Sequence, residues 1–237
     1  MTFLSWLVRY PRAVLIGLVA AVAAALATYT REQSLSGVYW ALRPVTTLLP
    51  WNRTAPSVAP RTLRSNFTLI DIRLVRSDGS LARYRKMSAY KANAPLSSYR
   101  EGVTASGTAT AFRSARGRIL ETTREHGFYM SKIDLGTRLE VGGAFTNVYE
   151  AELRNSFCRN SEEWTQQISF ETAQLVIQVH FPADRPPISF QTQVIDGTDV
   201  RSNVVTAQIV ELYGRKSLVW NVDKPNSAFV YKLAWQW

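Results

Sequence analysis

The distribution of apolar and polar residues divides the chain into two parts with different periodicity. Residues 13–29 form an uninterrupted apolar run, AVLIGLVAAVAAALATY, without a charged side chain. As an α-helix this run would rise roughly 26 Å, close to the hydrocarbon thickness of a thin bilayer. Arg9, Arg12 and Arg31 flank it, where cationic side chains reach lipid head groups. The pattern therefore predicts a single-pass transmembrane helix over residues 13–29.

Two other interpretations of this run stay open. A cleavable signal peptide has the same cationic start and apolar core, and Ala25, Leu26 and Ala27 fit a cleavage site. A buried helix of a soluble protein is the second alternative, although a short helix without a polar face is more typical of a membrane span. As a membrane helix, the run would present a face of small residues that permits close helix packing: Gly17, Ala20, Ala21, Ala24, Ala25 and Thr28.

The segments on either side of the run are expected to lie near the membrane surface. Residues 1–12 combine apolar side chains with two arginines and predict an interfacial, cationic N-terminus. Residues 30–65 begin with a polar connector and end in a stretch rich in proline and arginine. We expect a juxtamembrane segment followed by an extended basic linker there.

From residue 66 onward the period changes to two, which is typical of β-strands. Ile70, Ile72 and Leu74 alternate with polar residues, and the same alternation recurs in residues 174–181 and 228–237. Turn sequences separate these runs about every 8 to 12 residues, a spacing typical of sandwiches and barrels. The pattern predicts an all-β fold over residues 66–237, an antiparallel β-sandwich or barrel-like domain, either single or composed of two packed halves divided near residue 140.

The charge distribution places the basic surface next to the predicted helix. The net charge is +10, but residues 1–118 hold 17 Lys and Arg against four acidic residues, a net +13. Residues 119–237 hold 11 against 14, a net −3. A basic surface close to a bilayer is attracted to anionic lipids by about 1 kcal/mol for each Lys or Arg.

The sequence offers little material for catalysis. Cys158 is the single cysteine and only two histidines are present, so we expect no disulfide, metal site or cofactor. No glycine-rich phosphate loop or serine elbow occurs. We therefore expect the protein not to be an enzyme.

The strongest binding signal is a stretch in which cations alternate with tyrosines. Arginine and lysine beside flat rings suit a nucleotide, a lipid head group or a single-stranded nucleic acid, and the alternative is a solvated edge strand whose charges prevent further pairing. The predicted ligand-binding residues are Arg83, Tyr84, Arg85, Lys86, Tyr90, Lys91 and Arg100. The aromatic alternation from Phe229 to Trp237 is expected in the core instead.

Three segments of the C-terminal part carry a resemblance to known modules. They read YEAELRNSFCRNSEEW from Tyr149, VHFPADRPP from Val179 and YKLAWQW at the end. Residues 140–237 resemble uncharacterised β-sandwich modules of bacterial conflict and signalling membrane proteins. The resemblance implies a transmembrane effector whose β domain senses a signal or oligomerises.

These observations together favour a non-enzymatic, membrane-anchored bacterial protein of the inner membrane. The hypothesis is a defence effector: the β domain binds a small anionic ligand, a nucleotide or a phospholipid head group, or forms a homo-oligomer, and the clustered helices perturb the lipid bilayer. Two alternatives stay open. One is a structural component of an envelope complex with a periplasmic β domain, and the other is a secreted β protein with a cleaved signal peptide.

Overall fold

The computed structural model describes the chain from residue 62 to its end, except residues 126, 169, 198, 203–206 and 213. The predicted segments 1–12 and 13–29, with the small-residue face from Gly17 to Thr28, lie outside the described residues, as does most of the segment 30–65. No helix in the described part is long and apolar enough to cross a bilayer.

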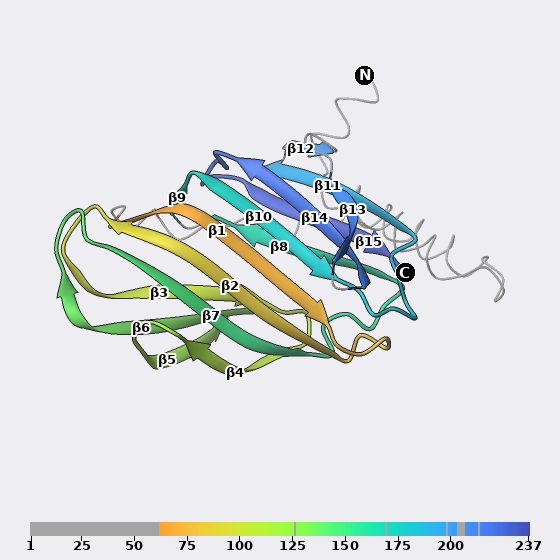
Figure 1. Cartoon of the computed structure of the whole chain (residues 1–237), viewed down its shortest axis with the longest axis horizontal. Helices are drawn as coiled ribbons and strands as arrows, with labels where there is room; N and C mark the ends of the chain where they lie inside the picture. The colour runs from red at the N-terminus through yellow and green to blue at the C-terminus, as the bar shows by residue number, and fades with distance from the viewer. Residues whose placement is uncertain (1–61, 126, 169, 198, 203–206, 213) are drawn as a thin grey trace, which may run out of the picture. The chain divides into compact units, whose positions relative to one another are not determined.

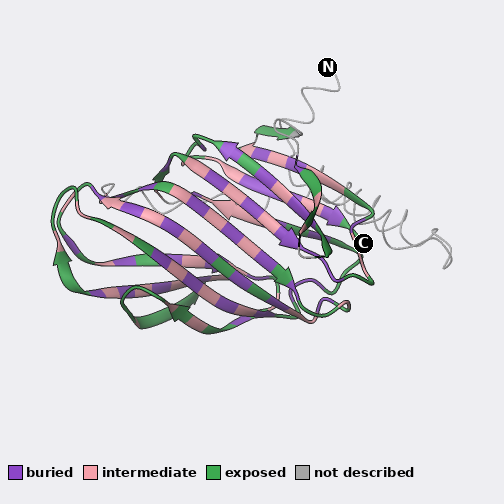
Figure 2. Cartoon of the chain, in the orientation of Figure 1, coloured by how far each residue is buried: buried purple, intermediate pink, exposed green. Residues whose placement is uncertain are grey.

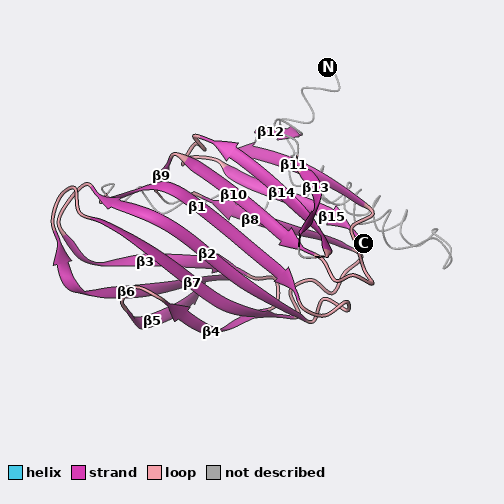
Figure 3. Cartoon of the chain, in the orientation of Figure 1, coloured by secondary structure: helices cyan, strands magenta, loops and turns pink. Residues whose placement is uncertain are grey.

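The described part is built of strands (Figure 3), which confirms the prediction of an all-β fold. Their bounds are β1 (Leu63–Leu74), β2 (Leu81–Ala92), β3 (Leu96–Thr104), β4 (Thr108–Ser114), β5 (Arg118–Glu125), β6 (Phe128–Leu139), β7 (Ala144–Arg154), β8 (Ser161–Gln167), β9 (Glu171–Thr172), β10 (Gln174–His180), β11 (Ser189–Asp196), β12 (Asp199–Ser202), β13 (Gln208–Leu212), β14 (Arg215–Asp223) and β15 (Val230–Gln236).

The largest sheet, sheet A, has the order β13-β14-β10-β1-β2-β7-β4, with the short β9 also paired to β1 (Figure 1). It takes strands from both sides of residue 140. Most neighbours are antiparallel, but β1 pairs with β10 in parallel, with Thr68 opposite Leu175. The short β9 also pairs with β1 in parallel. The expectation of a wholly antiparallel fold is wrong at these two pairs, because the chain passes through β8 of another sheet before it reaches them, a crossover connection that permits parallel neighbours.

A second layer covers one face of sheet A and consists of two smaller sheets. Sheet C has the order β12-β11-β15-β8 and sheet B has the order β3-β6-β5. The two meet where the Thr104 hydroxyl of β3 donates to the carbonyl of Thr165 in β8, at 3.2 Å. The domain is therefore a two-layer sandwich in which sheet A contacts sheet C along one part and sheet B along the other.

The core lies between the layers and follows the alternation seen in the sequence. Ile70, Ile72 and Leu74 of β1 are fully buried, and so are the three alternate residues from Leu175 to Val179 in β10. Burial alternates along the strands of sheet A in Figure 2. The aromatic alternation of β15 is also in the core, with Tyr231, Trp235 and Trp237 buried, which confirms that prediction.

Strand β2 lies in the middle of sheet A, between β1 and β7. The alternative interpretation of this segment, a solvated edge strand, is therefore wrong. A central strand tolerates these cations because alternate side chains point to opposite faces of the sheet. Arg83 and Arg85 point to the outer face of sheet A, which is exposed. Lys86 points into the core, where it pairs with Glu101.

Candidate functional site

The structure does not bring the seven predicted ligand-binding residues together. Alternation along β2 buries one set in the core and leaves the other on the opposite, outer face of sheet A. The buried set is Tyr84, Lys86 and Tyr90, and the outer set is Arg83, Arg85 and Lys91. Arg100 is exposed on β3, in the other layer.

The buried set forms an ionic contact between the two layers. Lys86 Nζ lies 2.7 Å from Glu101 Oε2, and the Tyr90 hydroxyl donates to Glu101 Oε1. Glu101 comes from β3 and is 2% exposed. Removing two charges from water is costly unless they are paired and hydrogen-bonded, and here they are both. This contact holds β2 against sheet B and is closed to ligands.

Tyrosines surround this ion pair, and their pKa values are raised. Burial raises the pKa of Tyr84 and Tyr90 well above the ordinary value, and the negative charge of Glu101 raises it further. Burial also raises the pKa of Tyr149 to about 12, partly offset by its hydrogen bond with Ser131 at 2.7 Å. These hydroxyls therefore stay protonated at neutral pH, and those of Tyr90 and Tyr149 serve as neutral hydrogen-bonding groups of the core.

The outer face of sheet A carries two neighbouring rows of charged residues. In the alternating row, Asp71, Arg85, Glu150 and Arg113 are successive cross-strand neighbours on β1, β2, β7 and β4. The signs alternate, and Arg85 Nε lies 3.7 Å from Glu150 Oε1. This row is close to electrically balanced.

The second row, the two-arginine row, is not balanced. Arg73 on β1 lies directly opposite Arg83 on β2, and Glu152 follows on β7. The Glu152 carboxylate is already bonded to Arg154 at 3.0 Å. Within the described part of the chain, neither Arg73 nor Arg83 has an ion pair or hydrogen bond through its side chain. Like charges directly opposite each other destabilise a sheet, so this arrangement favours an anion between them.

A β-bulge in β4 brings Arg113 to the outer face. The register between β4 and β7 shifts between Thr110 and Arg113, and Ala111 has a left-handed φ of 54°. The extra residue turns Phe112 inward, where it stacks on Tyr149, and turns Arg113 outward opposite Glu150. Bulges often re-aim a side chain beside a binding site, and left-handed alanine costs about 1–2 kcal/mol.

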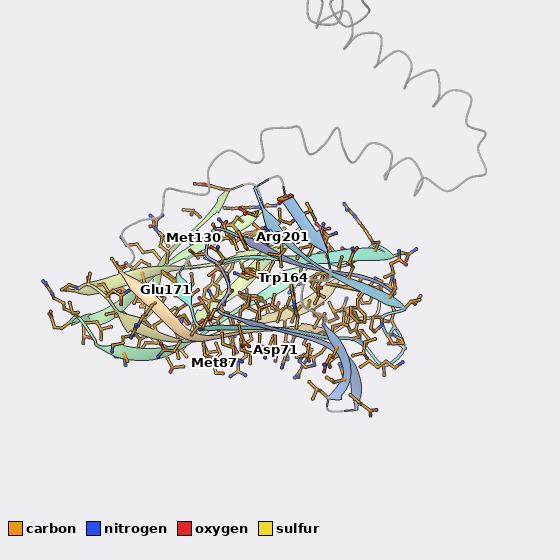
Figure 4. All side chains as sticks on the ribbon, turned by 90° about the horizontal axis from the view of Figure 1, so that it is seen from above. Asp71, Met87, Met130, Trp164, Glu171 and Arg201 are labelled. Atoms are coloured by element: carbon orange, nitrogen blue, oxygen red, sulfur yellow. The ribbon has the colours of Figure 1, made fainter. Side chains whose placement is uncertain are left out.

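The two rows line a groove of about 500 Å³ on the outer face. This volume is within the usual range for small-molecule sites. Asp71 is labelled in Figure 4 on the same side of the molecule as Met87, which lies on the same face of β2 as the arginines. The groove is bordered by four arginines against three carboxylates: Arg73, Arg83, Arg85 and Arg113, with Asp71, Glu150 and Glu152.

His180 and Ser217 continue the outer face beyond Asp71. His180 Nε2 lies 3.3 Å from Asp71 Oδ1, and its Nδ1 lies 2.8 Å from the Ser217 hydroxyl. These three residue types also form the catalytic triad of serine hydrolases. Ser217, however, has no exposed surface, so a substrate cannot reach its hydroxyl. The contacts fix the orientation of Asp71 at the edge of the groove.

A second hollow, of about 510 Å³, lies where the β1–β2 turn meets two other loops. Two arginines and two aspartates are among the residues that line it: Arg76, Arg215, Asp78 and Asp184. The Asp78 carboxylate accepts a hydrogen bond from the amide of Ser80 in its own turn, at 2.9 Å. Sites carried by strands are held more accurately than sites on loops, so the groove is the better candidate.

Arg73 and Arg113 are the groove arginines that the sequence analysis missed, and the carboxylates of Asp71, Glu150 and Glu152 were missed as well. Alternation places Arg73 on the polar face of its strand, but only the register pairs it with Arg83. The bulge at Ala111 conceals Arg113, because strict alternation would send it inward. Glu101 was missed as well, although its inward position between Tyr99 and Val103 marks it.

The sequence matches no family model and no curated protein. Among solved structures, an M1 zinc metallopeptidase of Deinococcus radiodurans, bound to a Tyr-Ser-Ala substrate, is similar at 13% identity and a TM-score of 0.48. The match covers 75% of this chain and 44% of that chain. A candidate protease of Parabacteroides distasonis is similar at 10% identity and a TM-score of 0.47, over 76% of this chain and 41% of that one.

The chain thus spans less than half the length of these similar structures. Within the described residues, no group of three or more His, Cys, Asp or Glu side chains is placed to hold a metal ion.

Proposed function

We propose that the β domain is a non-catalytic binding module that captures an anion, most simply a phosphate group, between Arg73 and Arg83. The observation that carries this proposal is the direct cross-strand pairing of two exposed arginines that have no partner in the described part. Arginine binds oxyanions with two parallel hydrogen bonds. In the alternating row beside them, the arginines are balanced by Asp71 and Glu150. The anion therefore binds at the end of the groove that holds the two-arginine row.

In the same proposal, residues 13–29 tether the module to the bacterial inner membrane. Their uninterrupted apolar run and small-residue face support close packing of several such helices. Binding of the anion to the β domain promotes self-association, and the clustered helices perturb the bilayer in the manner of a defence effector.

Titration calorimetry of the full-length protein in detergent, with inorganic phosphate, tests the binding step. We expect the double variant Arg73→Gln/Arg83→Gln to bind phosphate at least about tenfold more weakly, because each charge-assisted hydrogen bond contributes about 1.5–3 kcal/mol. The control variant Arg118→Gln/Arg138→Gln removes the same charge from exposed positions of β5 and β6 and should bind as the unaltered protein does.

The same variants test the membrane step in induced cells. The unaltered protein and the control variant should depolarise the membrane, whereas the Arg73/Arg83 variant at equal abundance should not. Equal phosphate affinity in the two double variants would contradict the proposed site. Full depolarisation by the Arg73/Arg83 variant would show that the membrane effect does not require anion binding, and would contradict the proposed coupling of the two.

A further inference from the structure

The chemistry of the groove indicates which kind of anion it accepts. Its lining contains arginine, aspartate, glutamate and alanine, and one aromatic residue, Tyr84. The Tyr84 side chain is 1% exposed and stacks on Trp164 in the other layer, with ring centroids 5.4 Å apart. Figure 4 labels Trp164 away from the side on which Asp71 lies. The groove therefore offers no aromatic surface on which a nucleobase could stack.

The carboxylates of Glu150 and Asp71, next to the two-arginine row, can accept further hydrogen bonds. The Glu150 side chain is 46% exposed, and its ion pair with Arg85 is a single contact at 3.7 Å. Asp71 lines the groove and contacts His180 through Oδ1, and its second oxygen has no hydrogen bond or ion pair within the described residues. An ionised carboxylate only accepts hydrogen bonds, so these two groups select a ligand that carries donors.

The spacing of the rows sets the size of the ligand. Asp71 is two residues before Arg73 on β1, and Arg85 is two residues after Arg83 on β2. Two residues along a strand span roughly 7 Å. An anionic group at the two-arginine row thus places whatever is attached to it beside Asp71 and Glu150. Bare phosphate would fill only one end of the groove and would face carboxylates of its own charge.

We infer that the ligand is a phosphorylated polyol, with its phosphate between Arg73 and Arg83 and its hydroxyl groups donating to Asp71 and Glu150. The inference rests on the proposed function, because it assigns the class of ligand to the same site. A free sugar or inositol phosphate and an inositol phospholipid head group share this chemistry. A nucleotide fits it less well, because the groove offers its base no exposed aromatic ring.

Calorimetry with three soluble probes tests the assignment on the full-length protein in detergent. The probes are inorganic phosphate, myo-inositol 1-phosphate and adenosine 5′-monophosphate. We expect inositol phosphate to bind at least about tenfold more tightly than inorganic phosphate, because its hydroxyl groups add one or two hydrogen bonds to carboxylates. Adenosine monophosphate should gain less, because it carries fewer hydroxyl groups and its base finds no exposed aromatic ring in the groove.

The variant Glu150→Val separates hydrogen bonding from electrostatics. It removes an acceptor and a negative charge from an exposed position of a central strand, so phosphate should bind equally or more tightly while the advantage of inositol phosphate falls. If the variant acted only through the loss of negative charge, the affinities for phosphate and for inositol phosphate would rise by the same factor. Glu140→Val makes the same charge change after β6, where Glu140 is 70% exposed, and should leave all affinities unchanged.

Asp71→Asn provides a second variant that keeps the shape beside His180, and thermal unfolding confirms that each variant is folded. Equal affinities for phosphate and inositol phosphate, or tightest binding of adenosine monophosphate, would overturn the inference while leaving anion capture by Arg73 and Arg83 intact. Absence of binding by every probe would overturn both. Sedimentation with phosphatidylinositol vesicles, compared with phosphatidylcholine vesicles, then assigns the inositol phosphate to a lipid or to a free molecule.

Discussion

The two parts of the sandwich interior are held together by different chemistry. Where sheet A faces sheet C, the contacts are aromatic: Trp220 packs on Tyr231 with centroids 5.9 Å apart, and Phe181 packs on Trp235 at 5.7 Å. Where sheet A faces sheet B, rings also pack across the layers, as Tyr90 does on Tyr99 with centroids 5.6 Å apart. The Lys86–Glu101 ion pair and the Tyr149–Ser131 hydrogen bond are added to them there. Both parts gain stability from apolar burial, and the second adds specific pairing to it.

This difference affects the groove, because β2 contributes one face to the contact with sheet B and the other face to the groove. Its inner face carries Lys86, and its outer face carries Arg83 and Arg85. An apolar contact would tolerate small shifts of β2 over sheet B, whereas an ion pair with hydrogen bonds fixes one position. We hypothesise that the buried pair sets the position of β2, and therefore of the two-arginine row, as buried polar groups do in some other folds.

Breaking the buried ion pair is expected to give the largest effect on stability. Glu101→Leu leaves the Lys86 ammonium in the core without its counter-charge, which should lower the free energy of unfolding by about 3–5 kcal/mol. Replacing all three partners, as Lys86→Met/Tyr90→Phe/Glu101→Leu, should recover most of this loss. Urea unfolding followed by tryptophan fluorescence measures both.

The exposed pair of Arg138 and Glu140, in which both side chains are 70% exposed, supplies the control. Glu140→Leu should change the free energy of unfolding by less than about 0.5 kcal/mol. A loss of less than about 1 kcal/mol for Glu101→Leu would mean that water or another group compensates Lys86. The two parts of the interior would then differ less than their contacts indicate.

The contact between sheets A and C should lose stability when a buried apolar side chain is made smaller, because it is held by apolar packing. Leu233 of β15 is fully buried beneath sheet A, and Leu233→Ala should cost about 3 kcal/mol through lost burial and the cavity that remains. Ile188→Ala changes a residue that is 79% exposed and should cost less than about 0.5 kcal/mol. Similar values for the two variants, from the same urea unfolding measurement, would contradict an apolar core between sheets A and C.

The sequence predicts the faces of the strands well and their neighbours poorly. Alternation alone placed Ile70, Ile72 and Leu74 inside, because each strand has one buried face whatever its partner. The parallel pairing of β1 with β10 depends on contacts between residues such as Thr68 and Leu175, which are far apart in the chain. No local pattern encodes such a contact.

The site was harder to predict for a related reason. Arg83, Tyr84, Arg85 and Lys86 are consecutive and look like one cluster, yet period-two alternation divides them between groove and core. Applied strictly, the same rule would have separated them. It would not have found Arg113, because the bulge at Ala111 occurs without a glycine to mark it, nor Glu101, whose partner is in another sheet.

Alkaline pH should distinguish the two parts of the interior with a smaller effect. Burial holds the pKa of Tyr149 at about 12 in the folded protein, whereas an unfolded tyrosine titrates near 10. Above pH 10 the unfolded chain loses this proton and the folded protein keeps it. Stability is therefore complete below pH 10 and falls by about 1.4 kcal/mol per pH unit for this tyrosine as the pH rises toward 12.

Urea unfolding from pH 9 to pH 11 measures this slope in the unaltered protein and in Tyr149→Phe. The variant should be less stable by about 1 kcal/mol at pH 9, because it lacks the hydrogen bond with Ser131, and its stability should fall less steeply above pH 10. Leu233→Ala should lower stability equally at every pH, because it removes no titrating group. If Tyr149→Phe left the slope unchanged, the Tyr149 hydroxyl would titrate as it does in water. The contacts of sheet A with sheet B would then be open to solvent, and the ion pair could not fix β2 beneath the groove.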